Sequence, residues 1–183
     1  MRIGGGAFRG RPLRTPKGEA TRPTSGLVRE TLCNILATEL PDARVLDLFA
    51  GCGSVGLEAL SHGAAHAVFV EQAKPALECL RTNVAALGVD AEVFPIPVAR
   101  ALAALARLGT PFDVIFLDPP FADAAAYAAV LTAAATSRLL APAGVLVAQH
   151  DARTALPDAA DGLTRTRLKV IGDNALSFYR WAE

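Results

Sequence analysis

Short apolar runs rich in β-forming residues alternate along this chain with segments of helical periodicity. The runs that we interpret as strands are 43–49, 66–71, 91–96, 112–118 and 144–149. Helices are expected between them, at 55–61, 74–88, 98–107 and 123–138. Because parallel strands need a long crossover, repeated strand–helix units predict a doubly wound α/β fold with a mostly parallel sheet.

The two ends of the chain depart from this alternation. Residues 166–181 alternate apolar and polar side chains around a Gly-Asp-Asn turn, which predicts a C-terminal antiparallel hairpin. Between Pro23 and Pro41, apolar residues recur at helical spacing and predict one amphipathic helix. Residues 1–22 place short apolar pieces among Gly, Arg and Pro, as expected for a small β-hairpin arm ahead of a domain over 23–183.

Positive charge is concentrated at the start of the chain, although the whole chain is neutral. Eighteen Lys and Arg balance eighteen Asp and Glu, yet residues 1–30 hold seven basic and two acidic side chains. Such a segment can supply phosphate contacts to nucleic acid, and Phe8 can stack on an unpaired base. The alternative is that the arginines form a solvated face and that Phe8 packs the arm down.

Cysteine usage and hydropathy exclude several classes of protein. Cys33, Cys52 and Cys79 are an odd number, are widely separated and contain no C-x-x-C pair, which argues against a disulfide framework or a structural zinc site. We therefore expect a cytoplasmic protein without a metal. The N-terminus has no apolar signal core, and no segment approaches the roughly 18 uninterrupted apolar residues of a membrane span, so no membrane association is expected.

A glycine-rich loop separates the first strand from the next helix. Residues 51–56, GCGSVG, match G-x-G-x-x-G in this context, and Glu71 ends the following strand twenty residues after Gly51. The pattern indicates a nucleoside-containing cofactor whose ribose hydroxyls bind Glu71. Asp47, just ahead of the loop, would repel a pyrophosphate but attract the ammonium and sulfonium groups of S-adenosylmethionine. We therefore favour S-adenosylmethionine over a dinucleotide, with a plain strand-to-helix turn as the alternative.

A pair of prolines follows the fourth predicted strand, in the sequence Asp118-Pro119-Pro120-Phe121. Ligands of doubly wound sheets bind at the carboxyl ends of the central strands, so this motif is expected beside the glycine loop. The Asp118 carboxylate and the rigidly held Pro119 carbonyl can accept the two hydrogens of a nucleobase amine, which leaves the nitrogen lone pair facing a methyl group. Phe121 would stack on the base. The alternative is a proline-rich strand end with Phe121 buried.

These blocks resemble the class I S-adenosylmethionine-dependent methyltransferases that modify exocyclic amines, whose signature is [D/N]PP[F/Y/W]. More closely, the chain is similar to the RsmD family of bacterial 16S ribosomal RNA guanine-N2 methyltransferases. The matching blocks run nearly end to end, in the order MRIGGGAFRGRPL, RPTSGLVRETLCNIL, LDLFAGCGSVGLEALSHGA, FVE and FDVIFLDPPF. The resemblance implies a Rossmann-like enzyme with a seven-stranded sheet, whose last hairpin inserts antiparallel, that methylates 16S rRNA in the small ribosomal subunit or its assembly intermediate. We expect a monomer.

The resemblance also implies roles for individual residues. The expected S-adenosylmethionine contacts are Arg22, Thr24, Asp47, Phe49, Ala50, Gly51, Gly53, Ser54, Gly56, Glu71 and Gln72. The expected catalytic residues are Asp118, Pro119, Pro120 and Phe121, and the expected RNA contacts are Arg2, Phe8, Arg9, Arg11, Arg14 and Lys17. Arg29 and Glu30 are expected to support the segment around Thr24.

One block departs from the family pattern. Relatives usually carry an acidic residue after the third strand to hold the adenine amine, whereas residues 94–99, FPIPVA, contain none. Backbone groups and apolar contacts would then hold adenine. Other functions stay open at this stage: methylation of a DNA amine or a protein glutamine, a non-catalytic RNA-binding assembly factor with this fold, or a nicotinamide dehydrogenase.

Overall fold

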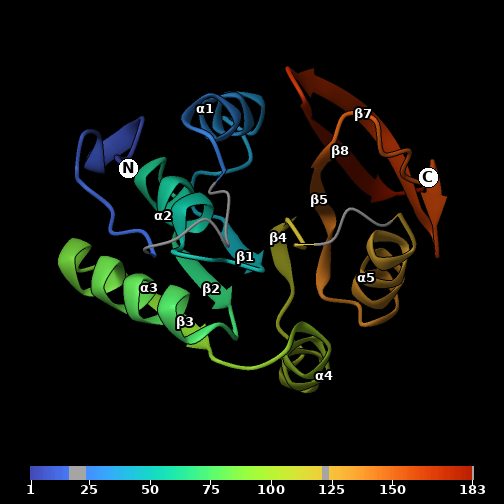
Figure 1. Cartoon of the computed structure of the whole chain (residues 1–183). Coiled ribbons are helices and arrows are strands. Elements are labelled where there is room, and N and C mark those ends of the chain that lie inside the picture. The colour runs from blue at the N-terminus through green and yellow to red at the C-terminus, as the bar shows by residue number, and fades with distance from the viewer. Residues whose placement is uncertain (17–23, 121–123, 183) are drawn as a thin grey trace.

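The computed structural model describes residues 1–16, 24–120 and 124–182 (Figure 1). The strands are β1 Arg44–Leu48, β2 His66–Val70, β3 Ala91–Phe94, β4 Phe112–Leu117, β5 Leu140–Asp151, β6 Ala159–Ala160, β7 Leu163–Ile171 and β8 Asn174–Trp181. The helices are η1 Gly6–Phe8, α1 Gly26–Ile35, α2 Ser54–Ser61, α3 Lys74–Leu87, α4 Val98–Leu108 and α5 Ala124–Thr136. The predicted alternation of strands and helices is confirmed.

All the described strands form a single mixed sheet. Its strand order is β3-β2-β1-β4-β5-β8-β7-β6, with β1 to β5 parallel and the last three joined in antiparallel fashion. Chain order reverses between β1 and β4, and in such sheets a ligand binds at the carboxyl ends of the strands at this point. The loops after β1 and β4 meet there.

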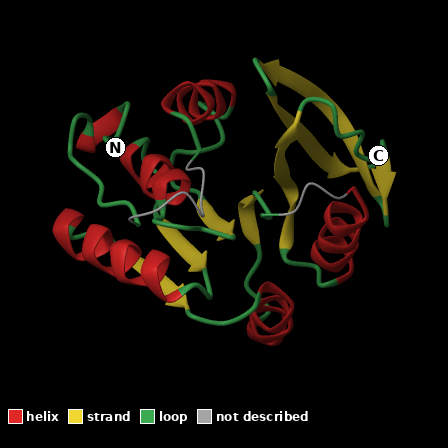
Figure 2. Ribbon diagram, viewed as in Figure 1, coloured by secondary structure: helices red, strands yellow, loops and turns green. Residues whose placement is uncertain are grey.

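Helices cover both faces of the sheet, as Figure 2 shows. One apolar cluster joins the sheet to α1 and α2, and a second joins the opposite face to α4 and α5. The central strands are buried on both faces, because β1 and β4 alternate between the two clusters: Val45 and Val114 belong to the first, and Leu46 and Ile115 to the second. Because helices cover both faces of the sheet, a ligand can reach the central strands only at their ends, and the carboxyl edge is where a site is expected.

Three details differ from the sequence-based expectations. The sheet has eight strands within the described residues because β6 adds a two-residue antiparallel pairing. The N-terminal arm folds back on itself but pairs over less of its length than expected: Arg2 forms one antiparallel bridge with Pro12, and the amides of Ile3 and Leu13 donate to the Arg11 and Met1 carbonyls, since the glycines and Pro12 have little tendency to form longer strands. Helix α1 is shorter than the range from Pro23 to Pro41, and Leu27, expected on its apolar face, is 63% exposed.

No helix in the described ranges has the length and apolar character needed to cross a lipid bilayer.

Candidate functional site

The glycine loop has the strained backbone that its sequence predicts. Gly51 and Gly53 have φ angles of 57° and 83°, in the left-handed region where a side chain is disfavoured. Phe49, at the end of β1, also has a positive φ of 64°, which is uncommon for a residue with a side chain. Ala50 and Ser54 are buried beside this turn, and α2 begins at Ser54. The loop therefore presents its backbone, not bulky side chains, to the carboxyl edge of the sheet.

Gly56 and Asp47 form a tight contact between α2 and β1. The Gly56 amide donates to Asp47 Oδ2 at 3.0 Å. A Cβ atom on Gly56 would lie 2.4 Å from Cε1 of the Phe69 ring and 3.3 Å from Asp47 Oδ2, so only glycine fits without displacement. The motif glycine is thus explained by the close approach of helix and sheet.

Asp47 is a buried carboxylate without a cationic partner among the described residues. Burial raises the pKa of Asp47 to about 7, an effect that the Gly56 amide opposes and that the charges of Asp118 and Glu71 reinforce. A cation placed beside Asp47 would stabilise its ionised form, whereas an anion would not. The site therefore fits the ammonium of a methionine group and disfavours a pyrophosphate.

Glu71 connects the end of β2 to the glycine loop. Its Oε2 accepts a hydrogen bond from the Gly51 amide at 2.8 Å, and its Oε1 accepts from the amides of Gln72 and Ala73 at 2.8 and 2.7 Å. A carboxylate offers about four acceptor positions. One position on Oε2 remains for a ribose hydroxyl, and a second such bond would have to replace an amide.

Asp118 lies at the end of β4, where the segment leading into α1 covers it. Thr24 Oγ1 donates to Asp118 Oδ2 at 3.4 Å. Burial raises the pKa of Asp118 to about 7, and the hydrogen bond from Thr24 opposes this effect only in part. Pro119 is buried and Pro120 is exposed. The structure thus brings Thr24, Asp47 and Asp118 to one edge of the sheet, while the predicted site residues Lys17, Arg22 and Phe121 lie outside the described ranges.

A buried ion pair, which sequence analysis did not identify, anchors this edge. Arg29 Nε lies 3.1 Å from Glu58 Oε2, with side chains 4% and 1% exposed. Arg29 also donates to the Thr24 carbonyl at 2.7 Å and to the Arg2 carbonyl at 2.9 Å, which confirms its expected support of the Thr24 segment. Glu58 Oε1 accepts from the Gly4 and Gly5 amides, both at 2.8 Å. The pair therefore joins α1, α2 and the N-terminal segment.

The N-terminal segment is docked onto the domain and does not project from it. Asn83 of α3 accepts from the Arg14 amide at 2.8 Å, and donates to the Arg14 and Cys52 carbonyls at 3.0 and 2.9 Å. Phe8 is partly buried against the first apolar cluster, and its amide donates to Ser61 Oγ at 2.9 Å. One helix side chain thus links the arm to the glycine loop, and Phe8 has the packing role considered above.

The basic side chains of the arm differ in their surroundings. Arg2, Arg9, Arg11 and Arg14 are all exposed. The Arg2 guanidinium donates to the Gly10 carbonyl at 2.7 Å, and that of Arg11 donates to the Ala86 carbonyl at 2.8 Å. Arg9 and Arg14 have no such side-chain contact among the described residues. These two residues are therefore the side chains of the arm best placed to contact an anionic partner.

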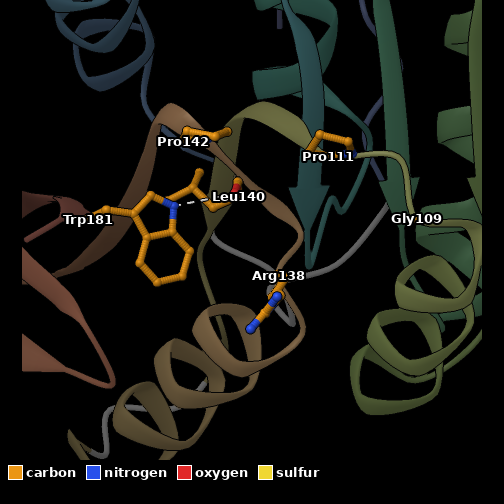
Figure 3. A pocket seen from close by; sticks show the side chains of 6 residues that line it. All are labelled: Gly109, Pro111, Arg138, Leu140, Pro142 and Trp181. Atoms are coloured by element: carbon orange, nitrogen blue, oxygen red, sulfur yellow. Dashed lines mark hydrogen bonds between the residues drawn. The ribbon is translucent and has the colours of Figure 1, made fainter.

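A separate depression of about 440 Å³ lies at the opposite edge of the sheet, where β4 and β5 begin (Figure 3). It is lined by Gly109, Pro111, Arg138, Leu140, Pro142 and Trp181. The Trp181 indole donates to the Leu140 carbonyl at 3.4 Å. This depression is separated from Asp47 and Asp118 by the length of the strands, so it is not part of the site. In the described part of the chain, no three His, Cys, Asp or Glu side chains gather to hold a metal.

The doubly wound sheet, the strained glycine loop and the carboxylates at its carboxyl edge define a class I methyltransferase fold. The comparisons agree. A family model described as "Conserved hypothetical protein 95" matches residues 1–180, and the chain belongs to this family. The RsmD-type resemblance is thereby confirmed: the Ribosomal RNA small subunit methyltransferase D of Escherichia coli K12 is 36% identical over 180 residues, 98% of this chain and 89% of that protein.

Solved structures show the same likeness. Escherichia coli yhhF superposes with a TM-score of 0.87 at 36% identity and covers 100% of this chain and 99% of its own. The T. thermophilus 16S rRNA N2 G1207 methyltransferase RsmC, solved with AdoMet and guanosine, superposes with a TM-score of 0.70 at 25% identity. It covers 91% of this chain, which corresponds to 44% of that protein. The fold is therefore shared with nucleic-acid methyltransferases over almost the whole chain.

Proposed function

We propose that this protein transfers the methyl group of S-adenosylmethionine to the exocyclic N2 amine of a guanine in 16S ribosomal RNA, of the guanine(966)-N2 type, in the small subunit or its assembly intermediate. The observation that carries the proposal is the position of Asp118 at the switch point of the sheet, beside the buried Asp47 and covered by Thr24. The names of the relatives that span nearly the whole chain support an rRNA substrate.

The carboxyl edge would hold the cofactor through three groups. Asp47 faces the methionine ammonium, Glu71 binds a ribose hydroxyl through its remaining acceptor position, and the backbone of Gly51 to Gly53 approaches the ligand closely. S-adenosylmethionine supplies an electrophilic methyl group on a sulfonium. Because residues 94–99 offer no carboxylate, adenine would rest against the partly buried Phe94, Ile96 and Val98.

Asp118 and Pro119 would prepare the nitrogen for attack. The guanine amine is a weak nucleophile because its lone pair is delocalised into the ring. Accepting its two hydrogens on the Asp118 carboxylate and the Pro119 carbonyl favours a pyramidal nitrogen whose lone pair points at the methyl carbon. Such a charge-assisted hydrogen bond contributes about 1.5–3 kcal/mol, whereas alignment of two bound reactants contributes about 7–11 kcal/mol. Positioning by the pocket therefore supplies most of the rate.

The proton balance also favours Asp118. The new C–N bond forms as the S–C bond breaks, and the methylated nitrogen then carries one hydrogen too many. An Asp118 carboxylate whose pKa is about 7 can take up this proton and return it to water at neutral pH. S-adenosylhomocysteine and N2-methylguanine are the products, and no further reactant is needed.

The N-terminal arm would dock the RNA. Its exposed Arg9 and Arg14 are available for phosphates, and Asn83 ties the arm to the loop that holds the cofactor. To reach Asp118 the target base must leave the stack, which costs least in a loop of RNA. Phe121 would then stack on it.

The test is to incubate the purified protein with labelled S-adenosylmethionine and one of four acceptors: unmodified small subunits, naked 16S RNA, duplex DNA or a glutamine-rich protein. Nuclease digestion and mass spectrometry locate the label, and Asp118→Ala is the matched inactive control. Label on a guanine N2 of the subunit or its RNA supports the proposal. Label confined to DNA or a protein amide, or cofactor binding without any transfer, overturns it in favour of another acceptor or a non-catalytic assembly factor.

A further inference from the structure

Gln149, near the carboxyl end of β5, has a buried side-chain oxygen without a hydrogen-bond partner among the described residues. The residue is 7% exposed, and its Oε1 is inaccessible and has no hydrogen-bond partner in the described part of the chain. Two other buried side-chain atoms share this condition, on Arg44 and His66, but these residues begin β1 and β2 at the opposite edge of the sheet. Buried polar groups are nearly always paired, so an unpaired acceptor at the functional edge indicates a partner that arrives with a ligand.

The neighbours of Gln149 show which face of the sheet its side chain occupies. The next residue, His150, places its ring 6.1 Å from that of Tyr127, on α5. Because successive side chains of a strand point to opposite faces, Gln149 points toward the face covered by α1. Val145 and Val147, four and two residues earlier, belong to the cluster on that face. Gln149 therefore lies on the face of the proposed catalytic pocket.

Register then places Gln149 beside Asp118. Leu117, the last residue of β4, pairs with Ala148 of β5. Asp118 and Gln149 directly follow this pair, so the two residues lie near each other where β4 ends. Asp118 faces α1 as well, since Thr24, just ahead of that helix, donates to it. On the other side, Gln149 pairs with the fully buried Leu176 of β8, which has no side-chain donor. An amide acceptor thus stands one strand away from the carboxylate.

The chemistry of nucleobases determines what such a pair can recognise. In guanine, the N2 amine is adjacent to a ring N1–H donor. In adenine and cytosine, the ring nitrogen adjacent to the amine is an unprotonated acceptor, which would repel an amide oxygen. An acceptor beside the residue that binds the amine therefore distinguishes guanine from the other amino bases.

We propose that Gln149 is a specificity-determining residue, whose Oε1 accepts the N1–H of the target guanine while Asp118 accepts a hydrogen of N2. This assignment rests on the proposed function and adds to it the group that selects the base. The oxygen is covered in the structure, so the contact forms after the terminal amide turns toward the entering base. Rotation about that sp³–sp² bond is soft.

The test compares two substrates in two proteins. Small subunits are reconstituted with 16S RNA that carries, at the labelled position, either guanine or 2-aminopurine, which keeps the 2-amine but has no hydrogen on N1. For the parent we expect kcat/KM for guanine to exceed that for 2-aminopurine by at least 100-fold. In Gln149→Met, which keeps the length of the side chain but removes the acceptor, we expect this ratio to fall at least tenfold, through loss on guanine.

Two further measurements separate selection from a structural role. Gln149→Glu keeps the acceptor and should retain the preference for guanine. S-adenosylmethionine binding should be the same in Gln149→Met as in the parent, and the variant should unfold at the same or a higher temperature, because an unpaired buried acceptor costs stability. An equal guanine to 2-aminopurine ratio in the parent and Gln149→Met overturns the inference alone. If the parent methylates no guanine N2, the proposed function fails together with it.

Discussion

Arg29 Nε lies 3.1 Å from Glu58 Oε2 in an almost fully buried ion pair that joins α1 to α2. The same two side chains bind the carbonyls of Arg2 and Thr24 and the amides of Gly4 and Gly5. Thr24 in turn donates to Asp118. One ion pair therefore fixes both the arm proposed to dock RNA and the segment over the proposed catalytic carboxylate.

Glu58→Gln should be strongly destabilising. The substitution leaves the Arg29 charge buried without its counter-charge, and breaking a buried pair in this way costs about 3–5 kcal/mol. The measurement is the free energy of unfolding in urea at pH 7. Glu39→Gln is the matched control, because Glu39 pairs with Arg180 at 2.8 Å near the surface, where such a pair contributes about 0–1 kcal/mol. Equal losses in the two variants would contradict the anchoring role of Glu58.

Asp118 should make activity depend on pH. The ionised carboxylate accepts a hydrogen of the amine more strongly than the carboxylic acid does, and only the ionised form can take up the released proton. Burial raises the pKa of Asp118 to about 7. We expect kcat/KM to rise about tenfold per pH unit below pH 7 and to level off above it. Asp118→Asn should lower kcat at least tenfold and remove this rise, with little change in S-adenosylmethionine binding. A pH-independent parent between pH 5.5 and 8.5 would exclude Asp118 as the titrating group.

The same pKa predicts that Asp118 lowers the stability of the fold at neutral pH. Its folded pKa of about 7 exceeds the unfolded value of about 3.9, so the folded protein binds this proton more tightly. The contribution is fully present below pH 4 and is lost as pH rises to about 7. Asp118→Asn should therefore become more stable than the parent as pH rises, by about 1 kcal/mol or more at pH 8, which is about 2–4 °C in Tm. A constant difference between pH 4 and 8 would contradict this.

The elements that carry the site could be predicted from local sequence. GCGSVG and Asp118-Pro119-Pro120 are recognisable because glycine and proline restrict the backbone in ways that only a few turns use, and each follows an apolar run. The N-terminal hairpin was predicted from the same kind of local signal, and the structure shows it as a single antiparallel bridge. Its contacts to α2 and α3 could not be predicted, because the residues that make them are distant in sequence.

The supporting polar residues were not predictable, because their partners are distant in sequence. Glu58 lies in the helix that follows the glycine loop, and it accepts hydrogen bonds from the amides of Gly4 and Gly5, which are 54 and 53 positions earlier in the sequence. Asn83 bonds Arg14, 69 positions earlier. On a helix such side chains look like ordinary solvent-facing positions, and only tertiary packing shows that they are buried. Gln149 ends a predicted strand that is otherwise apolar, and only the register of β4 and β5 shows that it lies near Asp118.

Gly56→Ala tests the close approach of α2 to the sheet. The added Cβ would lie 2.4 Å from the Phe69 ring and 3.3 Å from Asp47 Oδ2, so the helix, the ring or the carboxylate must move. Overpacking of this kind costs about 1–3 kcal/mol. We also expect at least tenfold weaker S-adenosylmethionine binding by calorimetry, since Asp47 loses its position. Gly26→Ala is the control, because the nearest atom to a Cβ added there, Nη2 of Arg29, is 4.0 Å away. Equal behaviour of the two variants would show that the contact at Gly56 is not needed.

Charge reversal of Arg9 and Arg14 tests whether the arm contacts RNA. Both side chains are exposed, and their backbone is anchored through Asn83 and the bridge of the arm, so Arg9→Glu with Arg14→Glu should leave Tm unchanged. Each lost phosphate contact reduces the slope of log K against log salt concentration by about 0.7–0.9. We expect the double variant to bind 16S RNA at least tenfold more weakly in 100 mM salt, with a slope reduced by about 1.5. The control reverses Arg100 and Arg107 of α4, which covers the opposite face of the sheet. An equal loss of affinity in the control would attribute the effect to net charge, and unchanged binding by the arm variant would return its arginines to a solvated face.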